Sequence, residues 1–312
     1  MDKAKGGQPY QPTGRTMQPV ETLSDMGVSK SQSSRYQQIA SVPEADFEQH
    51  IAEVKDKGGE LTSAGVRRLV KSQRQQDNRD KMAAITPVAV NNIEIRHQDC
   101  LDMISQLEDG SVSLLLTDPP YAVTDNDWDV WESRSVYLDF MRQWLIVMRS
   151  KMADEFTAFV FCDASMTVDI HQTLGRTGWP ILRQAIWHRP NLAKKRSGFM
   201  TFLSSYEPFW HCGNRRLNFP DDWGDERFDV QRVTAPQSNH IQDTAVHPTQ
   251  KPLALFERLV CLGSHPGDLV IDPFCGSGTT AVAAFNNDRR CITSDLMDEY
   301  VRIARGRLAQ VA

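Results

Sequence analysis

Short apolar runs alternate with longer segments of helical spacing in the part of the chain that follows residue 92. Residues 112–116, 158–162 and 268–271 form short, almost continuously apolar runs. Such runs are typical of strands that are buried on both faces of a parallel sheet. Residues 137–148 place large apolar side chains at i, i+3, i+4, i+7, i+8 and i+11, which predicts a helix with one apolar stripe. The pattern therefore predicts an α/β domain.

Weaker patterns extend this prediction to the end of the chain. Residues 217–246 are irregular and acidic, and their lack of periodicity predicts an insert without long regular elements. Further strands are expected at 93–96, 181–187, 205–211 and 290–294, and further helices at 101–107, 253–260 and 300–308. We expect the whole α/β domain to occupy residues 83–312.

The first 82 residues follow a different pattern. Residues 1–19 are rich in Gly, Pro, Gln and Thr and hold almost no large apolar residues, which predicts a disordered lead-in. Residues 20–82 show helical spacing and predict a small all-α domain. Helices are expected at 47–54 and 61–71, and the charged stretch 73–81 is interpreted as a linker or an extended helix.

A helix-turn-helix pattern opens this all-α domain. A first segment ends at Gly27, which can adopt a left-handed turn, and Ser29 can serve as the N-cap of a second helix at 30–40. In a helix-turn-helix the second helix reaches phosphates and base edges of DNA. A small helical bundle used for protein contact is the alternative. The candidate DNA-binding residues of the second helix are Ser31, Gln32 and Arg35.

Composition and charge exclude several classes of protein. A formal net charge of −5 argues against a surface that is basic throughout, so DNA contact must come from local basic patches. Six cysteines without a C-x-x-C pair predict a reducing compartment and argue against a zinc knuckle. No apolar run approaches the ~18 residues of a membrane span, and the N-terminus lacks a signal-peptide core. We therefore expect a cytoplasmic protein without a membrane partner.

One basic patch stands out in this acidic chain. Residues 183–216 contain seven Lys or Arg side chains against the single acid Glu207. Because the patch follows a predicted strand end, we interpret it as a contact for DNA phosphates, with a merely solvated loop as the alternative. The DNA-contact or recognition insert is expected at about 189–246. Its candidate DNA-binding residues are Arg189, Lys194, Lys195 and Arg196.

The apolar run 112–116 is followed closely by Asp118-Pro119-Pro120-Tyr121. Prolines lack a backbone N–H and fix φ, so the strand must end there. The carboxyl ends of strands are where open α/β sheets bind ligands. The carboxylate of Asp118 and the carbonyl of Pro119 offer two acceptors for one amine, and Tyr121 offers a flat face for a planar ring. This arrangement suits an exocyclic amine of a nucleobase; a proline-rich turn without function is the alternative.

A glycine-rich turn marks a second candidate site near the C-terminus. Gly276 and Gly278 let the backbone approach a ligand closely, and the N-terminus of the following helix favours an anionic group. Asp295 lies 23 residues after Asp272, near the spacing at which an acid binds ribose hydroxyls. These features alone fit a dinucleotide as well, so an NAD site is a local alternative.

Three motifs then occur in a fixed order: DPPY at 118–121, HPTQKP at 247–252 and DPFCGSGTT at 272–280. Together they resemble the β group of DNA amino-methyltransferases, in which the catalytic motif precedes the cofactor motif. The resemblance covers about residues 92–310. It implies a Rossmann-like S-adenosylmethionine-dependent methyltransferase fold with a seven-stranded mixed sheet and helices on both faces. The small all-α N-terminal domain lies outside it.

The resemblance also implies roles for individual residues. Asp118, Pro119, Pro120 and Tyr121 would hold a target base that is flipped out of double-stranded DNA. Asp99, which follows a predicted strand end, would touch the cofactor, although a helix N-cap explains it equally well. The residues that would bind S-adenosyl-L-methionine are Asp99, Lys251, Asp272, Phe274, Gly276, Gly278, Thr279 and Asp295. No metal is implied.

In that family an Asp at the first motif position leans toward adenine and a Ser toward cytosine N4. Asp118 therefore implies methyl transfer to adenine N6. A cytosine-N4 methyltransferase, or a DNA-binding regulator with an inactive methylase scaffold, is the alternative. The resemblance further implies a bacterial or phage-encoded enzyme of the restriction-modification type that acts on the nucleoid as a monomer or homodimer.

Overall fold

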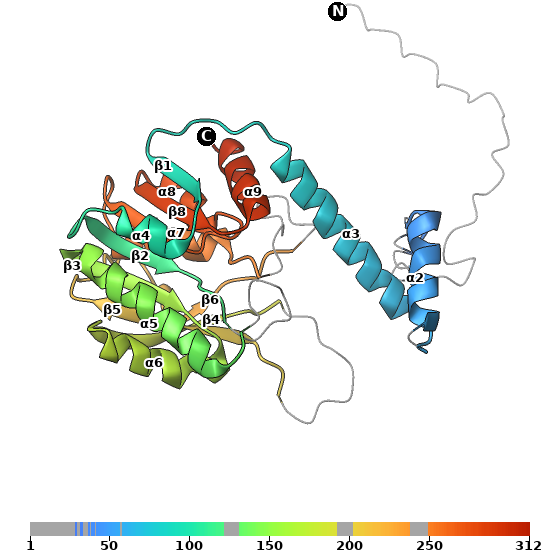
Figure 1. Ribbon diagram of the computed structural model, residues 1–312, viewed down its shortest axis with the longest axis horizontal. Coiled ribbons are helices and arrows are strands. Elements are labelled where there is room, and N and C mark those ends of the chain that lie inside the picture. Colours follow the sequence, from blue (N-terminus) through green and yellow to red (C-terminus); the bar gives the residue numbers. More distant parts are fainter. Residues whose placement is uncertain are drawn as a thin grey trace, which may run out of the picture. The chain divides into compact units, whose positions relative to one another are not determined.

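The computed structural model (Figure 1) describes residues 29, 32–33, 37, 39–40, 42–56, 58–121, 131–191, 202–237 and 249–312. Within these residues one eight-stranded sheet has the strand order β1-β8-β7-β2-β3-β5-β4-β6. The strands are β1 (Ile93–His97), β2 (Val112–Thr117), β3 (Met152–Phe161), β4 (Ile181–His188), β5 (Tyr206–Gly213), β6 (Val230–Arg232), β7 (Leu269–Asp272) and β8 (Arg290–Asp295).

The sheet is mixed, as the resemblance implied. Strands β1, β8, β7, β2 and β3 pair in parallel, β5 pairs antiparallel with both β3 and β4, and β4 pairs in parallel with β6. The described sheet has eight strands rather than seven because the three residues of β6 pair with the end of β4. This short strand lies in the stretch where the sequence has no clear periodicity.

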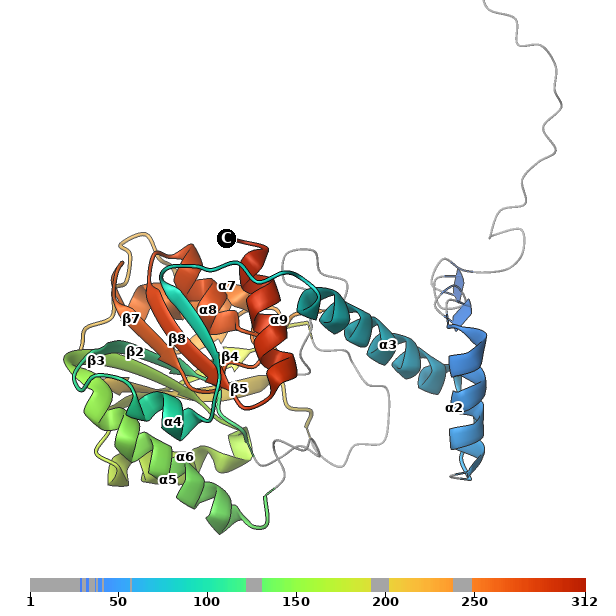
Figure 2. The ribbon, with the colours of Figure 1, turned by 45° about the horizontal axis from the view of Figure 1, so that its top comes forward.

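Helices cover both faces of the sheet (Figure 2). One face carries α4 (Cys100–Ser105), α5 (Arg134–Lys151) and α6 (Thr167–Arg176), and the other carries α7 (Leu253–Gly263), α8 (Thr279–Asn286) and α9 (Asp298–Ala309). Successive side chains of β2 enter the two cores in turn. Val112 and Leu115 pack with α5, whereas Leu114 and Leu116 pack with α7, and all four are fully buried. The prediction of a strand buried on both faces is therefore confirmed.

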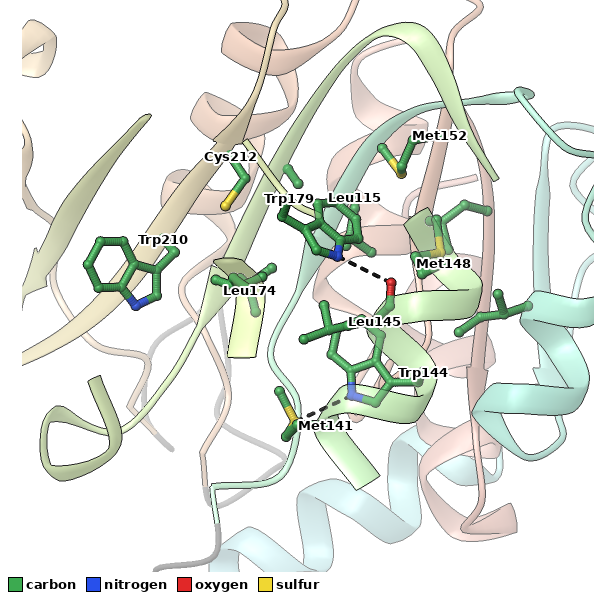
Figure 3. Close-up of a cluster of buried hydrophobic side chains, with 14 of the residues drawn as sticks. Leu115, Met141, Trp144, Leu145, Met148, Met152, Leu174, Trp179, Trp210 and Cys212 are labelled. Carbon is green, nitrogen blue, oxygen red and sulfur yellow. Dashed lines mark hydrogen bonds between the residues drawn. The ribbon is translucent and has the colours of Figure 1, made fainter. Parts of the chain in front are cut away.

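The apolar stripe of α5 fills the first of these cores (Figure 3). Its indole-bearing residue Trp144 donates its Nε1–H to the sulfur of Met141 at 3.3 Å, and Trp179 donates its Nε1–H to the carbonyl of Leu145 at 3.2 Å. Buried indole N–H groups need such partners. The buried members of the stripe are Tyr137, Met141, Trp144, Leu145 and Met148, which confirms the predicted helix.

The chain divides into two compact units, Met1–Gln73 and Arg74–Ala312, and the division falls inside α3 (Ser63–Ala83). This position is nine residues before the boundary expected at 82/83. The charged stretch 73–81 belongs to α3. Of the two interpretations, linker or extended helix, the extended helix is therefore confirmed. In the first unit, Gln73 donates its side-chain N–H to Asp46 of α2 (Glu44–Asp56) at 2.6 Å.

Ser29 caps a helical segment in the first unit, as its sequence position predicts. The N–H of Gln32 donates to Ser29 Oγ at 3.2 Å, and Gln32 Oε1 accepts from the N–H of Ser29 at 2.9 Å. This reciprocal pair is a capping box, which satisfies two otherwise unpaired donors at a helix start. The Oε1 atom of Gln32, a predicted DNA-binding residue, therefore helps to cap this helix.

Candidate active site

The DPPY segment lies at the end of β2, in the middle of the sheet. Strand β2 ends at Thr117, whose hydroxyl donates to Asp272 Oδ1 at 2.8 Å. Asp118 follows directly, and the two prolines prevent further pairing. Because parallel strands β2 and β7 end at the same edge, the DPPY segment and the glycine-rich turn after β7 are brought together, although they are more than 150 residues apart.

Both carboxylate oxygens of Asp118 already have donors. The hydroxyl of Tyr121 donates to Oδ1, and the ammonium of Lys251 donates to Oδ2. Lys251 Nζ also lies 3.0 Å from Glu207 Oε2, and the guanidinium of Arg189 donates to Glu207 Oε1 at 2.9 Å. The four charged side chains thus form a continuous ionic chain from Arg189 to Asp118, with Lys251 only 3% exposed at its centre.

The surroundings set the protonation of these groups. Burial raises the pKa of Asp118, and Glu207 adds to this effect while Lys251 opposes it. Burial disfavours the charge of Lys251, but the carboxylates of Asp118 and Glu207 outweigh it and raise its pKa. Burial and the adjacent carboxylates raise the pKa of Tyr121 well above its ordinary value, so that its hydroxyl stays a donor.

The turn after β7 is held rigidly by the carboxylate of Asp272. Its Oδ1 accepts from the backbone N–H of Phe274 at 3.1 Å, and its Oδ2 accepts from the hydroxyl of Thr280 at 2.6 Å. Burial raises the pKa of Asp272 to about 6, while its hydrogen bonds oppose that shift. Thr117, Phe274 and Thr280 all donate to this carboxylate, so Asp272 holds the turn in shape.

Two further carboxylates lie where neighbouring strands end. Asp295 ends β8, and its Oδ2 accepts from the N–H of Gly276 at 2.9 Å. Asp99 follows β1 and caps α4 by accepting from the N–H of Leu101 through Oδ1 at 2.8 Å. The N-cap interpretation of Asp99 is therefore confirmed, and the same residue lines the cavity described next, so its contact with a cofactor stays a prediction.

A cavity of about 240 Å³ joins these elements. One wall is aromatic, with the ring centroids of Trp131 and Phe140 4.9 Å apart and those of Phe140 and Phe274 5.9 Å apart. Carboxylates and the glycine-rich turn also line the cavity. Of the predicted site residues, the cavity is lined by Asp99, Asp118, Pro119, Pro120, Tyr121, Lys251, Asp272, Phe274, Gly276, Thr279 and Asp295.

The remaining predicted residues lie elsewhere. Gly278 lies beneath the cavity as the N-cap of α8, with φ at 79°. Arg189, whose contact with DNA phosphates stays a prediction, is half-buried and paired with Glu207. Ser31, Arg35, Lys194, Lys195 and Arg196 lie outside the described residues, as do the first two residues of the HPTQKP motif.

Sequence reasoning missed Glu207. It belongs to no recognised motif, and in the sequence it was only the single acid of a basic stretch. Strand β5 is antiparallel to its neighbours, so its first residues lie at the edge where the parallel strands end. An acid at the start of an antiparallel strand next to β3 was the available signal.

Comparison with known proteins agrees with this geometry. The model of the DNA methylase family, which groups N6 and N4 methyltransferases, matches residues 112–306. This chain belongs to that family. The methylase is 26% identical over 243 residues to the type II methyltransferase M2.MboI of Moraxella bovis, covering 70% of this chain and 89% of the relative. It is 28% identical over 243 residues to M2.DpnII of Streptococcus pneumoniae, covering 70% and 90%.

Solved structures show the same fold. A complex of M1.HpyAVI with S-adenosylmethionine matches the methylase with a TM-score of 0.55 and 24% identity, covering 69% of this chain and 98% of that one. The cytosine-N4-specific PvuII DNA methyltransferase matches with a TM-score of 0.61 and 18% identity, covering 72% and 89%. The methylase thus has the methyltransferase fold that its motifs implied.

S-adenosylmethionine is the cofactor of this family, and the cavity of the methylase fits it. Asp99 uses only Oδ1 among the described residues, which leaves Oδ2 for a ligand donor. The Nε1 of Trp131 is buried without a partner among them. Apolar walls next to unpaired polar atoms are typical of a cofactor pocket. Among the residues that the structure describes, no helix could span a membrane and no group of acidic, His and Cys side chains could hold a metal.

Proposed function

We propose that this methylase transfers a methyl group from S-adenosylmethionine to the exocyclic N6 of an adenine flipped out of double-stranded DNA. The observation that carries the proposal is the position of Asp118. Asp118, Pro119 and Tyr121 line the same cavity as the glycine-rich turn after β7. Two acceptors aimed at one amine select an exocyclic NH2 group and orient its nitrogen.

Each part of the chain has a defined task in this reaction. S-adenosylmethionine supplies the methyl group on an activated sulfonium. The carboxylate of Asp118 and the carbonyl of Pro119 accept the two amine hydrogens, which fixes the nitrogen and increases its electron density. Tyr121 stacks on the base and offsets part of the few kcal/mol that base flipping costs. Positioning supplies most of the rate acceleration, since such alignment can contribute roughly 7–11 kcal/mol.

The choice of adenine rests on the acidic side chain at position 118. The amines of adenine and cytosine both fit two acceptors, but in the family that the motifs resemble an Asp at this position leans toward adenine and a Ser toward cytosine N4. Burial raises the pKa of Asp118, so this carboxylate is also suited to accept the proton that the nitrogen loses after transfer. The proposed DNA contacts of the first unit and of the basic stretch 183–216 would bind the duplex.

The direct test is to identify the methylated nucleoside. Purified protein is incubated with unmethylated DNA and S-adenosylmethionine, and the DNA is digested and analysed by mass spectrometry. We expect N6-methyladenine. N4-methylcytosine would overturn the choice of base, and no methylated nucleoside with no cofactor binding would favour the regulator.

The matched control is Asp118→Ala. We expect this variant to lose methyl transfer by roughly 100-fold or more, since removing one preorganised hydrogen-bonding group costs 10²–10³. Calorimetry should show cofactor affinity within about threefold of wild type. An equal loss of cofactor affinity and turnover would contradict the role of Asp118 in holding the base.

A further inference from the structure

Each oxygen of Asp118 already accepts a hydrogen bond, so a target amine has to compete for the lone pairs that remain. Tyr121 donates to one oxygen and Lys251 to the other. Tyr121 also has to leave Asp118 before its ring can stack on a base. A second acceptor that takes over one of these two donors would open Asp118 to the amine. It would also spare the donor the roughly 1–3 kcal/mol that a buried donor without a partner costs.

Glu207 is placed to be that acceptor for both donors. Its Oε2 atom lies 3.0 Å from Lys251 Nζ and 3.5 Å from the hydroxyl of Tyr121. A single oxygen thus lies within reach of both groups that hold Asp118. The contact to Tyr121 is long, so small side-chain rotations suffice to shorten it while the bond to Asp118 is released.

The other oxygen of Glu207 is fixed from behind. Arg189 donates to Oε1 at 2.9 Å, and its guanidinium also contacts Ser204 Oγ and the carbonyl of Tyr206, each at 3.4 Å. Its guanidinium carbon lies 5.7 Å from the centre of the Trp187 ring. These contacts keep Glu207 in place, so that an exchange of partners at Oε2 does not displace the carboxylate.

We propose that Glu207 is a positioning residue for methyl transfer, which takes Lys251 and the Tyr121 hydroxyl from Asp118 when the target amine arrives. The inference rests on the proposed function. The exchange moves no proton and no net charge, because the two carboxylates, Lys251 and Arg189 keep their protonation. Only hydrogen-bond partners change, and each donor retains an acceptor throughout.

Glu207→Gln tests the exchange. Glutamine keeps the shape but has only one acceptor oxygen, which cannot serve Arg189 and the two exchanged donors together. We expect the single-turnover rate at saturating cofactor and DNA to fall roughly 10- to 100-fold, in line with the loss of a charge-assisted hydrogen bond. Cofactor and DNA affinities should stay within about threefold. Glu207→Asp, which keeps the charge, should recover part of the rate.

A binding measurement separates exchange from a general structural effect. With a non-reactive cofactor analogue, wild type should bind DNA with adenine at the target position more tightly than DNA with purine, which lacks the amine. Glu207→Gln should lose this preference. The matched control is Glu257→Gln on α7, whose side chain accepts from Asn286 at 2.7 Å and does not line the cavity. It should behave as wild type in both measurements.

The outcomes are distinguishable. If the wild type methylates DNA and Glu207→Gln is equally active, the role of Glu207 is overturned and the proposed function stands. A wild-type protein that transfers no methyl group would refute the proposed function, and the role of Glu207 with it. If Glu207→Gln no longer binds cofactor, Glu207→Asp decides the matter: a rate equal to wild type overturns the exchange, and a reduced rate with retained cofactor affinity supports it.

Discussion

Asp272 shows how a single buried carboxylate can make stability depend on pH. Its side chain is 2% exposed, and its oxygens accept hydrogen bonds from Thr117, Phe274 and Thr280. Burial raises its pKa from 3.8 to about 6. Between these values the native state binds a proton that the unfolded chain has released, so this residue's contribution to stability falls as the pH rises.

We therefore expect Asp272→Asn to remove a pH-dependent part of the unfolding free energy. The unfolding free energy of wild type minus that of the variant should be largest below pH 4. This difference should fall by roughly 3 kcal/mol as the pH rises beyond 6. Urea unfolding at several pH values would measure this difference, in which other titrating groups cancel. Parallel pH curves for the two proteins would contradict the shift.

Asp268→Asn is the matched control with the opposite sign. The N–H of His265 and the guanidinium of Arg215 outweigh the burial of Asp268 and lower its pKa. Its contribution is present above its ordinary pKa and is lost as the pH falls. The stability of wild type minus that of this variant should therefore increase with pH in the acidic range.

The start of α8 depends on the absence of a side chain at its N-cap. Gly278 has φ at 79°, and a Cβ built there would lie 2.7 Å from Cβ of Ala304 in α9. The turn that faces the cavity and the packing of α8 on α9 therefore share one residue. A methyl group at this position would strain the backbone and push the two helices apart.

We expect Gly278→Ala to lose at least tenfold in cofactor affinity and to destabilise the protein by more than the matched variant Gly110→Ala. Gly110 has a similar φ of 72° but nothing within 4 Å of a built Cβ. It should therefore cost only the backbone strain, about 1–2 kcal/mol. Calorimetry with S-adenosylmethionine and chemical unfolding would measure the two effects, and equal destabilisation by both variants would exclude the clash with Ala304.

At the level of elements, periodicity predicted the long helices and the strands whose residues are almost all apolar. The strand at 112–116 and the stripe of α5 were readable because their side chains alternate between two cores or repeat on one face. Helix α6 was missed because only two of its large apolar residues, Ile170 and Leu174, are buried. The edge strand β6 is too short for any period to show.

At the scale of the whole molecule, the two units of the chain carry different candidate sites. All residues that line the cavity belong to the unit Arg74–Ala312. The candidate helix-turn-helix belongs to the unit Met1–Gln73. Cofactor binding should therefore be independent of the first unit, whereas DNA affinity should depend on it if the helix-turn-helix interpretation is correct.

A chain that begins at Gly59, between α2 and α3, tests this separation. We expect S-adenosylmethionine to bind within about threefold of the full-length affinity, and DNA affinity, measured by fluorescence anisotropy, to fall at least tenfold as phosphate contacts are removed. Unchanged DNA affinity would favour the alternative in which the first unit serves protein contact. Lost cofactor binding would show that the second unit requires the first.

The candidate site was only partly readable from the sequence for a reason that belongs to the whole fold. Asp118 and the glycine-rich turn follow buried strands directly, so local pattern placed them at strand ends. Glu207 and Arg189 reach the same edge only because β5 runs against its neighbours and β4 ends beside it. Strand direction is a property of the assembled sheet and is not encoded in the apolar period of either strand.

The hydrogen bonds that join the end of β4 to the start of β5 have a consequence for how such enzymes can diversify. Arg189 donates its backbone N–H to the carbonyl of Ser205 at 2.8 Å and its guanidinium to Glu207. The ends of the intervening segment are therefore tied together at the site, whatever lies between them. Under the prediction that this segment contacts DNA, insertions, deletions and exchanges within it can change which DNA sequences are bound without moving Glu207. Recognition and reaction can thus evolve at different speeds in one continuous stretch of chain.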